Sequence, residues 1–157
     1  MSAPLRRAVL RVPRPALLAE RLGGLTVLER HLHLLRRAGF ESVRVEAPRP
    51  EAPLRVPEGL ALAWSPSPPP EEPYLWVSGE HLVRLGALKD AVAQDPASTL
   101  RWLGPDGREV LRLVGRGADG PDRTLSSDAA VTLSSPLTGG PADAWLMREA
   151  VKGTDGF

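Results

Sequence analysis

Apolar residues recur along the chain with two different periods, and these periods predict alternating strands and helices. Three short apolar runs have the length of buried strands, at residues 7–12, 40–45 and 74–77. Leucines at three-to-four spacing predict an amphipathic helix over residues 26–38, which Gly39 ends as a left-handed cap. A similar spacing of apolar residues predicts a second helix over residues 82–94.

Turn residues and prolines organise the rest of the chain. The turn at residues 104–107 joins two strand-like segments, 99–103 and 109–114, and predicts a hairpin. Prolines dominate residues 47–73 and predict extended surface loops there. Two further strands are predicted, at residues 60–64 and 129–133.

This order of elements predicts an α/β fold, a three-layer sandwich with a mostly parallel sheet. We expect the strands near Leu10, Val45 and Val77 to be adjacent and parallel. Residues 75–77 lack the alternation of a half-exposed strand, which is typical of a strand covered on both faces.

The composition excludes several classes of protein. A length of 157 residues fits one domain, and the net charge of +1 with 4% aromatic residues argues against a nucleic-acid partner. The chain has no cysteine, so it has no disulfide or thiolate metal site. Since no segment has the apolar length of a membrane span, the chain by itself reads as cytoplasmic.

The charged residues of the first half have a simple interpretation. The arginines at positions 30, 36, 37, 44, 49 and 55 predict a solvated face, with an anionic membrane surface as the alternative partner. His31 lies on the apolar stripe of the first helix and is predicted to be a core residue. His31 and His33 point to different helix faces, so they are not a metal pair.

The C-terminal residues carry the first family resemblance. Residues 144–157 contain the stretch Lys152-Gly153-Thr154-Asp155-Gly156. This stretch resembles the juncture in CDP-alcohol phosphatidyltransferases that carry a nucleotidyltransferase-like domain before the membrane enzyme, although Gly153 stands where the family has proline. The resemblance implies a single domain over residues 1–157, in which residues 141–157 form an exit helix and the start of a linker. It also implies a membrane transferase domain in cis as partner.

The N-terminal half resembles the sugar-nucleotide and MobA-like nucleotidyltransferases. The similarity rests on the order of a first strand at residues 8–10, a helix start at residues 24–30, and an Ala-Gly followed by a second strand within residues 34–45. In that family the fold binds a nucleoside triphosphate, so CTP and Mg²⁺ are the cofactors if the site is active.

Residues 76–83, which read Trp-Val-Ser-Gly-Glu-His-Leu-Val, are similar to the metal-binding turn of the inositol-phosphate cytidylyltransferase branch. The resemblance implies a Mg²⁺ ligand at Glu80, with His81 at the position of the family histidine. The family has aspartate there, and the extra methylene of glutamate displaces the ion, so we interpret the site as vestigial. In the alternative interpretation, Glu80 is a surface charge at a helix N-terminus.

The phosphate-binding loop departs from the family pattern. Residues 11–18 contain Pro13 and Pro15 and no glycine, so backbone N–H groups that would bind a triphosphate are missing. Arg14 could offer a positive charge to a phosphate, but a side chain does not replace a backbone cradle. We therefore expect CTP to bind weakly or not at all.

These observations support three functions. The first is a catalytically degenerate accessory domain of a CDP-alcohol phosphatidyltransferase, on the cytoplasmic face of the inner membrane, acting through docking, homodimer formation or ligand sensing. In that case this fragment is inactive alone and the parent protein is a phosphotransferase. The second is an active CTP-dependent cytidylyltransferase that makes a CDP-alcohol. The third is a stand-alone binding or scaffold protein unrelated to lipids.

Overall fold

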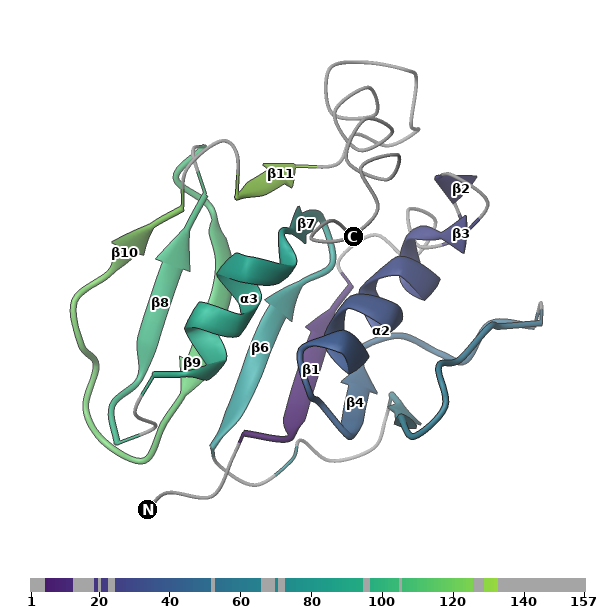
Figure 1. Cartoon of the computed structure of the whole chain (residues 1–157), viewed down its shortest axis with the longest axis horizontal. Coiled ribbons are helices and arrows are strands. Elements are labelled where there is room, and N and C mark those ends of the chain that lie inside the picture. The colour runs from purple at the N-terminus through teal and green to yellow at the C-terminus, as the bar shows by residue number, and fades with distance from the viewer. Residues whose placement is uncertain are drawn as a thin grey trace.

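The computed structural model describes residues 5–12, 19, 21–22, 25–51, 53–65, 70, 73–94, 97–104, 106–125 and 129–132. The helices within these residues are α2 (Val27–Arg37) and α3 (Leu85–Val92). The strands within them are β1 (Arg7–Arg11), β2 (Arg21–Leu22), β3 (Leu25–Thr26), β4 (Ser42–Val45), β5 (Ala61–Trp64), β6 (Tyr74–Ser78), β7 (His81–Val83), β8 (Leu100–Leu103), β9 (Glu109–Val114), β10 (Arg123–Thr124) and β11 (Ala130–Thr132) (Figure 1).

In the described part of the chain, seven strands form one sheet in the order β10-β8-β9-β6-β1-β4-β5. Strand β1 pairs in parallel with β4 on one side and with β6 on the other, and β4 pairs in parallel with β5. Strand β9 runs antiparallel to both of its neighbours, β6 and β8. The predicted α/β class, the mostly parallel sheet and the parallel neighbours of β1 are thus confirmed.

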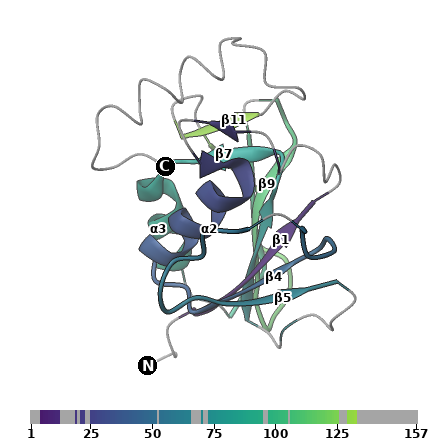
Figure 2. The ribbon, with the colours of Figure 1, turned by 90° about the vertical axis from the view of Figure 1, so that its right-hand side faces the viewer.

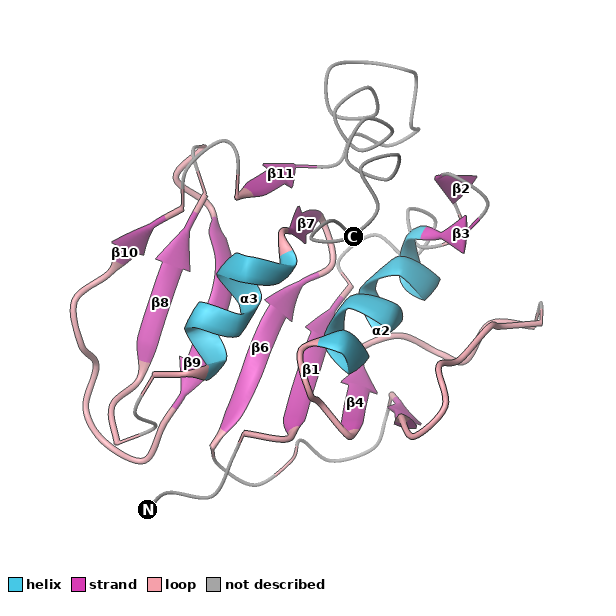
Figure 3. Cartoon of the chain, in the orientation of Figure 1, coloured by secondary structure: helices cyan, strands magenta, loops and turns pink. Residues whose placement is uncertain are grey.

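The two described helices lie on the same face of the sheet (Figure 2). They supply one outer layer of the predicted three-layer α/β sandwich, and Figure 3 shows them crossing in front of the strands. The helix predicted within residues 141–157 lies outside the described residues. Within those residues, no helix is long and apolar enough to cross a lipid bilayer.

The start and end of α2 follow from its sequence. Thr26 is the N-cap, and a capping box joins it to Glu29, with the Thr26 side chain accepting from Glu29 N–H and the Glu29 carboxylate accepting from Thr26 N–H. Gly39 follows the helix with a φ of 101°, which confirms the predicted left-handed cap. The chain can then turn directly into β4.

The core lies between the helices and the sheet. Phe40, Leu32 and Leu75 are among the largest side chains that are fully buried there. His31 is 2% exposed, which confirms the prediction of a core histidine. The interpretation of the arginines as one solvated face is wrong for Arg30, which is 5% exposed because α2 is buried on most of its circumference.

The main departures from the sequence prediction concern short strands. The second helix begins at Leu85 rather than at residue 82, because His81–Val83 form β7 and pair antiparallel with β11. The predicted strand at residues 129–133 therefore exists as β11, but it belongs to this separate small sheet. Strands β2, β3 and β10 span two residues each, too few to produce a periodic pattern.

Candidate functional site

The sheet topology points to the carboxyl ends of β1 and β6. The chain leaves β1 toward β4 and β5 on one side and then returns to β6 on the other side of β1. In open α/β sheets, ligands bind where the strand order reverses in this way, outside the carboxyl ends of the strands. Here those ends are Arg11 and Ser78.

The two strand ends approach each other very closely. Gly79 N–H donates to Arg11 O at 2.7 Å, which continues the ladder one residue beyond β6. A Cβ atom at Gly79 would lie 2.5 Å from Arg11 O, closer than such contacts allow. This position therefore requires glycine for close backbone approach.

The turn after β6 is held by the Ser78 hydroxyl. Its oxygen accepts from Glu80 N–H at 3.3 Å and lies 2.7 Å from His81 Nδ1. On the other side of the ring, His81 Nε2 lies 3.5 Å from Asp106 Oδ2. Because a carboxylate can only accept, the proton belongs on Nε2, and the Ser78 hydroxyl donates to Nδ1. The 3.5 Å contact is long for a hydrogen bond, so it orients the ring more than it satisfies Nε2.

The carboxylate of Glu80 is neutralised from a different part of the chain. Glu80 is 6% exposed and forms an ion pair with Arg108, which follows the turn between β8 and β9. A buried carboxylate without a compensating charge would be strongly destabilising, and Arg108 provides that charge. The β8–β9 turn thus contacts the β6–β7 turn through two pairs, Glu80 with Arg108 and His81 with Asp106.

Two histidines meet this turn from different elements. His31 Nε2–H donates to Gly79 O at 3.2 Å, which joins α2 to the end of β6. The pKa of His31 is lowered to about 4, mainly by burial. The hydrogen bond to Gly79 raises this pKa, and the nearby His81 lowers it. Burial also lowers the pKa of His81, although Asp106 acts in the opposite direction. Both rings are therefore neutral at pH 7.

A separate cavity lies at the same edge of the sheet. It has a volume of about 690 Å³ and lies beside the residues that follow β4 and the end of β5. Its wall includes Thr26, Glu29, Trp64 and the segments 47–51 and 53–55. Sequence reasoning did not identify this cavity, because it forms between a loop and a helix start that are far apart along the chain.

Glu29 fixes the position of the loop that closes this cavity. Its carboxylate accepts from Arg55 N–H at 2.7 Å, in addition to the capping contact with Thr26. Burial raises the pKa of the Glu29 carboxyl, but the hydrogen bonds from Thr26 and Arg55 outweigh it, so the pKa lies below its usual value. The negative charge thus ties the loop to the start of α2.

Two of the three predicted site residues, Glu80 and His81, lie in the described part of the chain. Glu80 and His81 lie at the carboxyl end of β6, and their role as metal residues stays a prediction. Among the described residues, no group of three or more His, Cys, Asp or Glu is placed to hold a metal ion. The alternative interpretation of Glu80 as a surface charge is wrong, because Glu80 is buried and α3 begins five residues later. Arg14 lies outside the described residues.

Two residues of this site were missed in the sequence. Asp106 and Arg108 read as turn residues of a hairpin, and nothing in their local pattern indicates that they reach Glu80 and His81. The contact depends on how β9 inserts antiparallel between β6 and β8. Local sequence carries no signal for that pairing.

Comparison with known proteins adds little. No protein-family model matches the chain, and no curated protein matches it in sequence. The chain is similar to the crystal structure of Rv0371C in complex with manganese, from Mycobacterium tuberculosis H37Rv, with 16% identity and a TM-score of 0.49 over 80% of this chain and 89% of that chain. This similarity is too low to carry an argument about function.

Proposed function

We propose that this chain is a catalytically degenerate nucleotidyltransferase-like domain that serves as an accessory to a CDP-alcohol phosphatidyltransferase in phospholipid synthesis. The ion pair between Glu80 and Arg108 is the observation that supports the loss of catalytic activity. Glu80 occupies the position at which the family resemblance implies a Mg²⁺ ligand. The carboxylate of Glu80 is already paired with the guanidinium of Arg108.

This ion pair opposes metal binding for an electrostatic reason. A hard divalent cation needs carboxylate oxygens that are open to it, usually together with several waters. Glu80 is buried, and the guanidinium beside it would repel a second cation at the same oxygens. Mg²⁺ could bind there only if Arg108 moved away. A domain in this state does not position a nucleoside triphosphate for attack.

The accessory role rests on the C-terminal sequence. Residues 144–157 resemble the juncture that precedes the membrane enzyme in CDP-alcohol phosphatidyltransferases. We therefore infer that the domain lies on the cytoplasmic face of the inner membrane, with the transferase domain in cis, and that it forms homodimers. This domain would be inactive alone, and the parent protein would be the phosphotransferase.

One observation favours the second candidate, an active CTP-dependent cytidylyltransferase. The cavity of about 690 Å³ lies at the carboxyl edge of the sheet, where α/β folds bind their ligands. If CTP and Mg²⁺ bound productively, the degenerate interpretation would be wrong. A calorimetric titration separates the two candidates.

The titration uses the wild-type chain and CTP, with and without MgCl₂. We expect no measurable binding, because the Glu80 carboxylate is paired with Arg108. Micromolar binding that requires Mg²⁺ and is abolished by Glu80→Ala would establish the enzyme interpretation instead. Glu41→Ala serves as the control carboxylate variant, since Glu41 pairs with Arg6 on the surface, away from this site.

The accessory role has its own test in the gene. We expect the reading frame to continue beyond Phe157 into several long apolar segments that contain an Asp-x-x-Asp-Gly motif. A stop codon directly after Phe157 would favour the third candidate, a stand-alone binding or scaffold protein unrelated to lipids.

A further inference from the structure

The sheet face opposite α2 and α3 carries a row of arginines. We call it the arginine face, and it consists of Arg7, Arg11, Arg44, Arg101 and Arg112. The cross-strand register places Arg44 beside Val9, Val9 beside Trp76, Trp76 beside Arg112 and Arg112 beside Arg101. Successive side chains of a strand point to opposite faces, and the neighbours of these residues along each strand pack in the core on the helix side.

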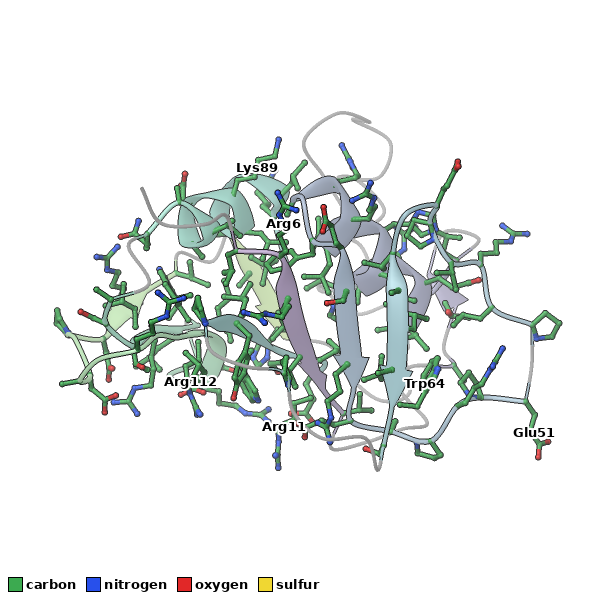
Figure 4. All side chains as sticks on the ribbon, turned by 90° about the horizontal axis from the view of Figure 1, so that it is seen from below. Arg6, Arg11, Glu51, Trp64, Lys89 and Arg112 are labelled. Carbon is green, nitrogen blue, oxygen red and sulfur yellow. The ribbon has the colours of Figure 1, made fainter. Side chains whose placement is uncertain are left out.

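Figure 4 shows this division directly. The labelled Arg11 and Arg112 lie on the side of the sheet away from the helices, whereas Arg6 and Lys89 lie on the helix side. Strands of parallel sheets are usually apolar on both faces, because helices cover both. Here the second face is polar, and neither described helix lies on it. A polar face of this kind suits a polar partner better than an apolar helix.

The charges on this face do not cancel. Arg11 and Arg44 share one carboxylate, that of Glu46, at 3.8 and 3.4 Å. Arg101 pairs with Asp122 at 3.0 Å, and Arg112 pairs with Glu109. Four of the five arginines therefore pair with three carboxylates, and no carboxylate of the described chain pairs with Arg7, so positive charge is in excess among the described residues of this face. Three of these side chains are well exposed, with Arg11 at 56%, Arg101 at 43% and Arg112 at 39%, whereas Arg44 is 17% exposed.

Trp76, at the centre of the face, distinguishes between two polyanionic partners, single-stranded RNA and a lipid surface. The guanidinium of Arg112 lies over the Trp76 ring, 5.2 Å from its centroid. Sheet proteins that bind single-stranded RNA stack bases on open aromatic rings, and here the ring is already occupied by Arg112. Arginines in a row on one sheet face, with a half-buried tryptophan among them, instead match the phosphate layer of a lipid surface.

We propose that the arginine face docks on the anionic lipid headgroups of the membrane. This inference rests on the proposed function for the presence of a membrane domain in cis. Each arginine near such a surface contributes only modestly, but a tethered domain needs little affinity, because the linker keeps its local concentration high. The domain would then lie with its sheet against the membrane and with α2 and α3 facing the cytoplasm.

Co-sedimentation with lipid vesicles tests the proposal on the whole 157-residue chain. The probes are vesicles of pure phosphatidylcholine and vesicles that also contain phosphatidylglycerol. We expect binding only to the latter, and Arg7→Gln/Arg112→Gln should lower the partition coefficient about 25-fold, about fivefold for each charge removed. The matched control, Arg37→Gln/Lys89→Gln, removes the same charge from exposed positions on the helix side and should leave binding near the wild-type level.

Three results would overturn the proposal: no binding to phosphatidylglycerol vesicles, equal loss of binding in the two double variants, or retention on a single-stranded RNA oligonucleotide in place of vesicles. The circular dichroism spectrum and urea midpoint of each variant show whether the fold is intact, and Arg7→Lys/Arg112→Lys should restore binding if charge is the cause. The CTP titration tests whether the domain has lost nucleotide binding, and vesicle binding tests whether the arginine face docks on a membrane. The two experiments can therefore fail independently of each other.

Discussion

Lowering the pH from 7 to 5 should destabilise this protein through His31. The ring is 2% exposed and donates from Nε2 to Gly79 O at the junction of α2 and β6. Burial lowers the pKa of His31 from an ordinary value of 6.5 to about 4, so the folded protein resists the proton that the unfolded chain accepts. The unfolded state therefore binds more protons between these two pH values, and stability falls as the pH falls.

The size of the effect follows from the same two values. Each pH unit between them is equivalent to about 1.4 kcal/mol, so His31 alone should remove about 2 kcal/mol of unfolding free energy between pH 7 and pH 5. Full loss, about 3 kcal/mol, is reached as the pH passes below about 4. His81, whose pKa is also lowered by burial, acts in the same direction. The carboxyl of Glu29 titrates at lower pH, because its pKa is below its usual value.

Urea unfolding at pH 7, 6 and 5 measures the effect directly. The variant His31→Gln keeps a neutral N–H donor for Gly79 O but cannot be protonated, so it should lose about 2 kcal/mol of the pH dependence. His33→Gln is the matched control, because it removes a histidine from another face of the same helix. If the unfolding free energy of the wild type were constant from pH 7 to pH 5, or if the two variants had equal pH dependence, the assignment to His31 would be wrong.

Two substitutions test the backbone geometry of the site. Gly79→Ala should destabilise the protein by about 1–3 kcal/mol in urea unfolding, because the new Cβ meets Arg11 O, whereas Gly86→Ala, with no atom within 4 Å of its Cβ position, should be neutral or stabilising; equal effects of the two would contradict the close approach. Thr26→Ala should cost about 1 kcal/mol and reduce helicity by circular dichroism, since it removes the cap of α2, and an unchanged unfolding midpoint would show that the cap is not needed.

The elements that sequence predicted well are those whose signal is local. The helix over 26–38 was predicted from its apolar stripe and from Gly39, and the structure shows α2 with both of these features. The parallel strands around β1 could be predicted because their apolar runs are short and continuous. Each of these signals lies within about a dozen residues, so no knowledge of distant partners was needed.

The candidate site was harder, because its contacts join distant parts of the chain. Glu80 could be singled out from its neighbours in sequence, but its burial and its pairing with Arg108 could not. That pairing depends on where β9 enters the sheet, which is a tertiary event. Strand β7 was read as the start of a helix for a similar reason, since its partner β11 is nearly fifty residues away.

The internal position of β1 in the sheet also governs how the protein can fold during synthesis. Strand β1 is made first, yet Ala8 pairs with Val43 on one side and with Leu75 on the other. Closing such long loops makes folding slow, and an apolar strand without its neighbours is prone to aggregate. Strand β1 therefore stays unpaired on its β6 side until residues beyond Ser78 have emerged from the ribosome. Truncations that stop before β6 should yield insoluble chains, because they leave the apolar strand β1 unpaired along one edge.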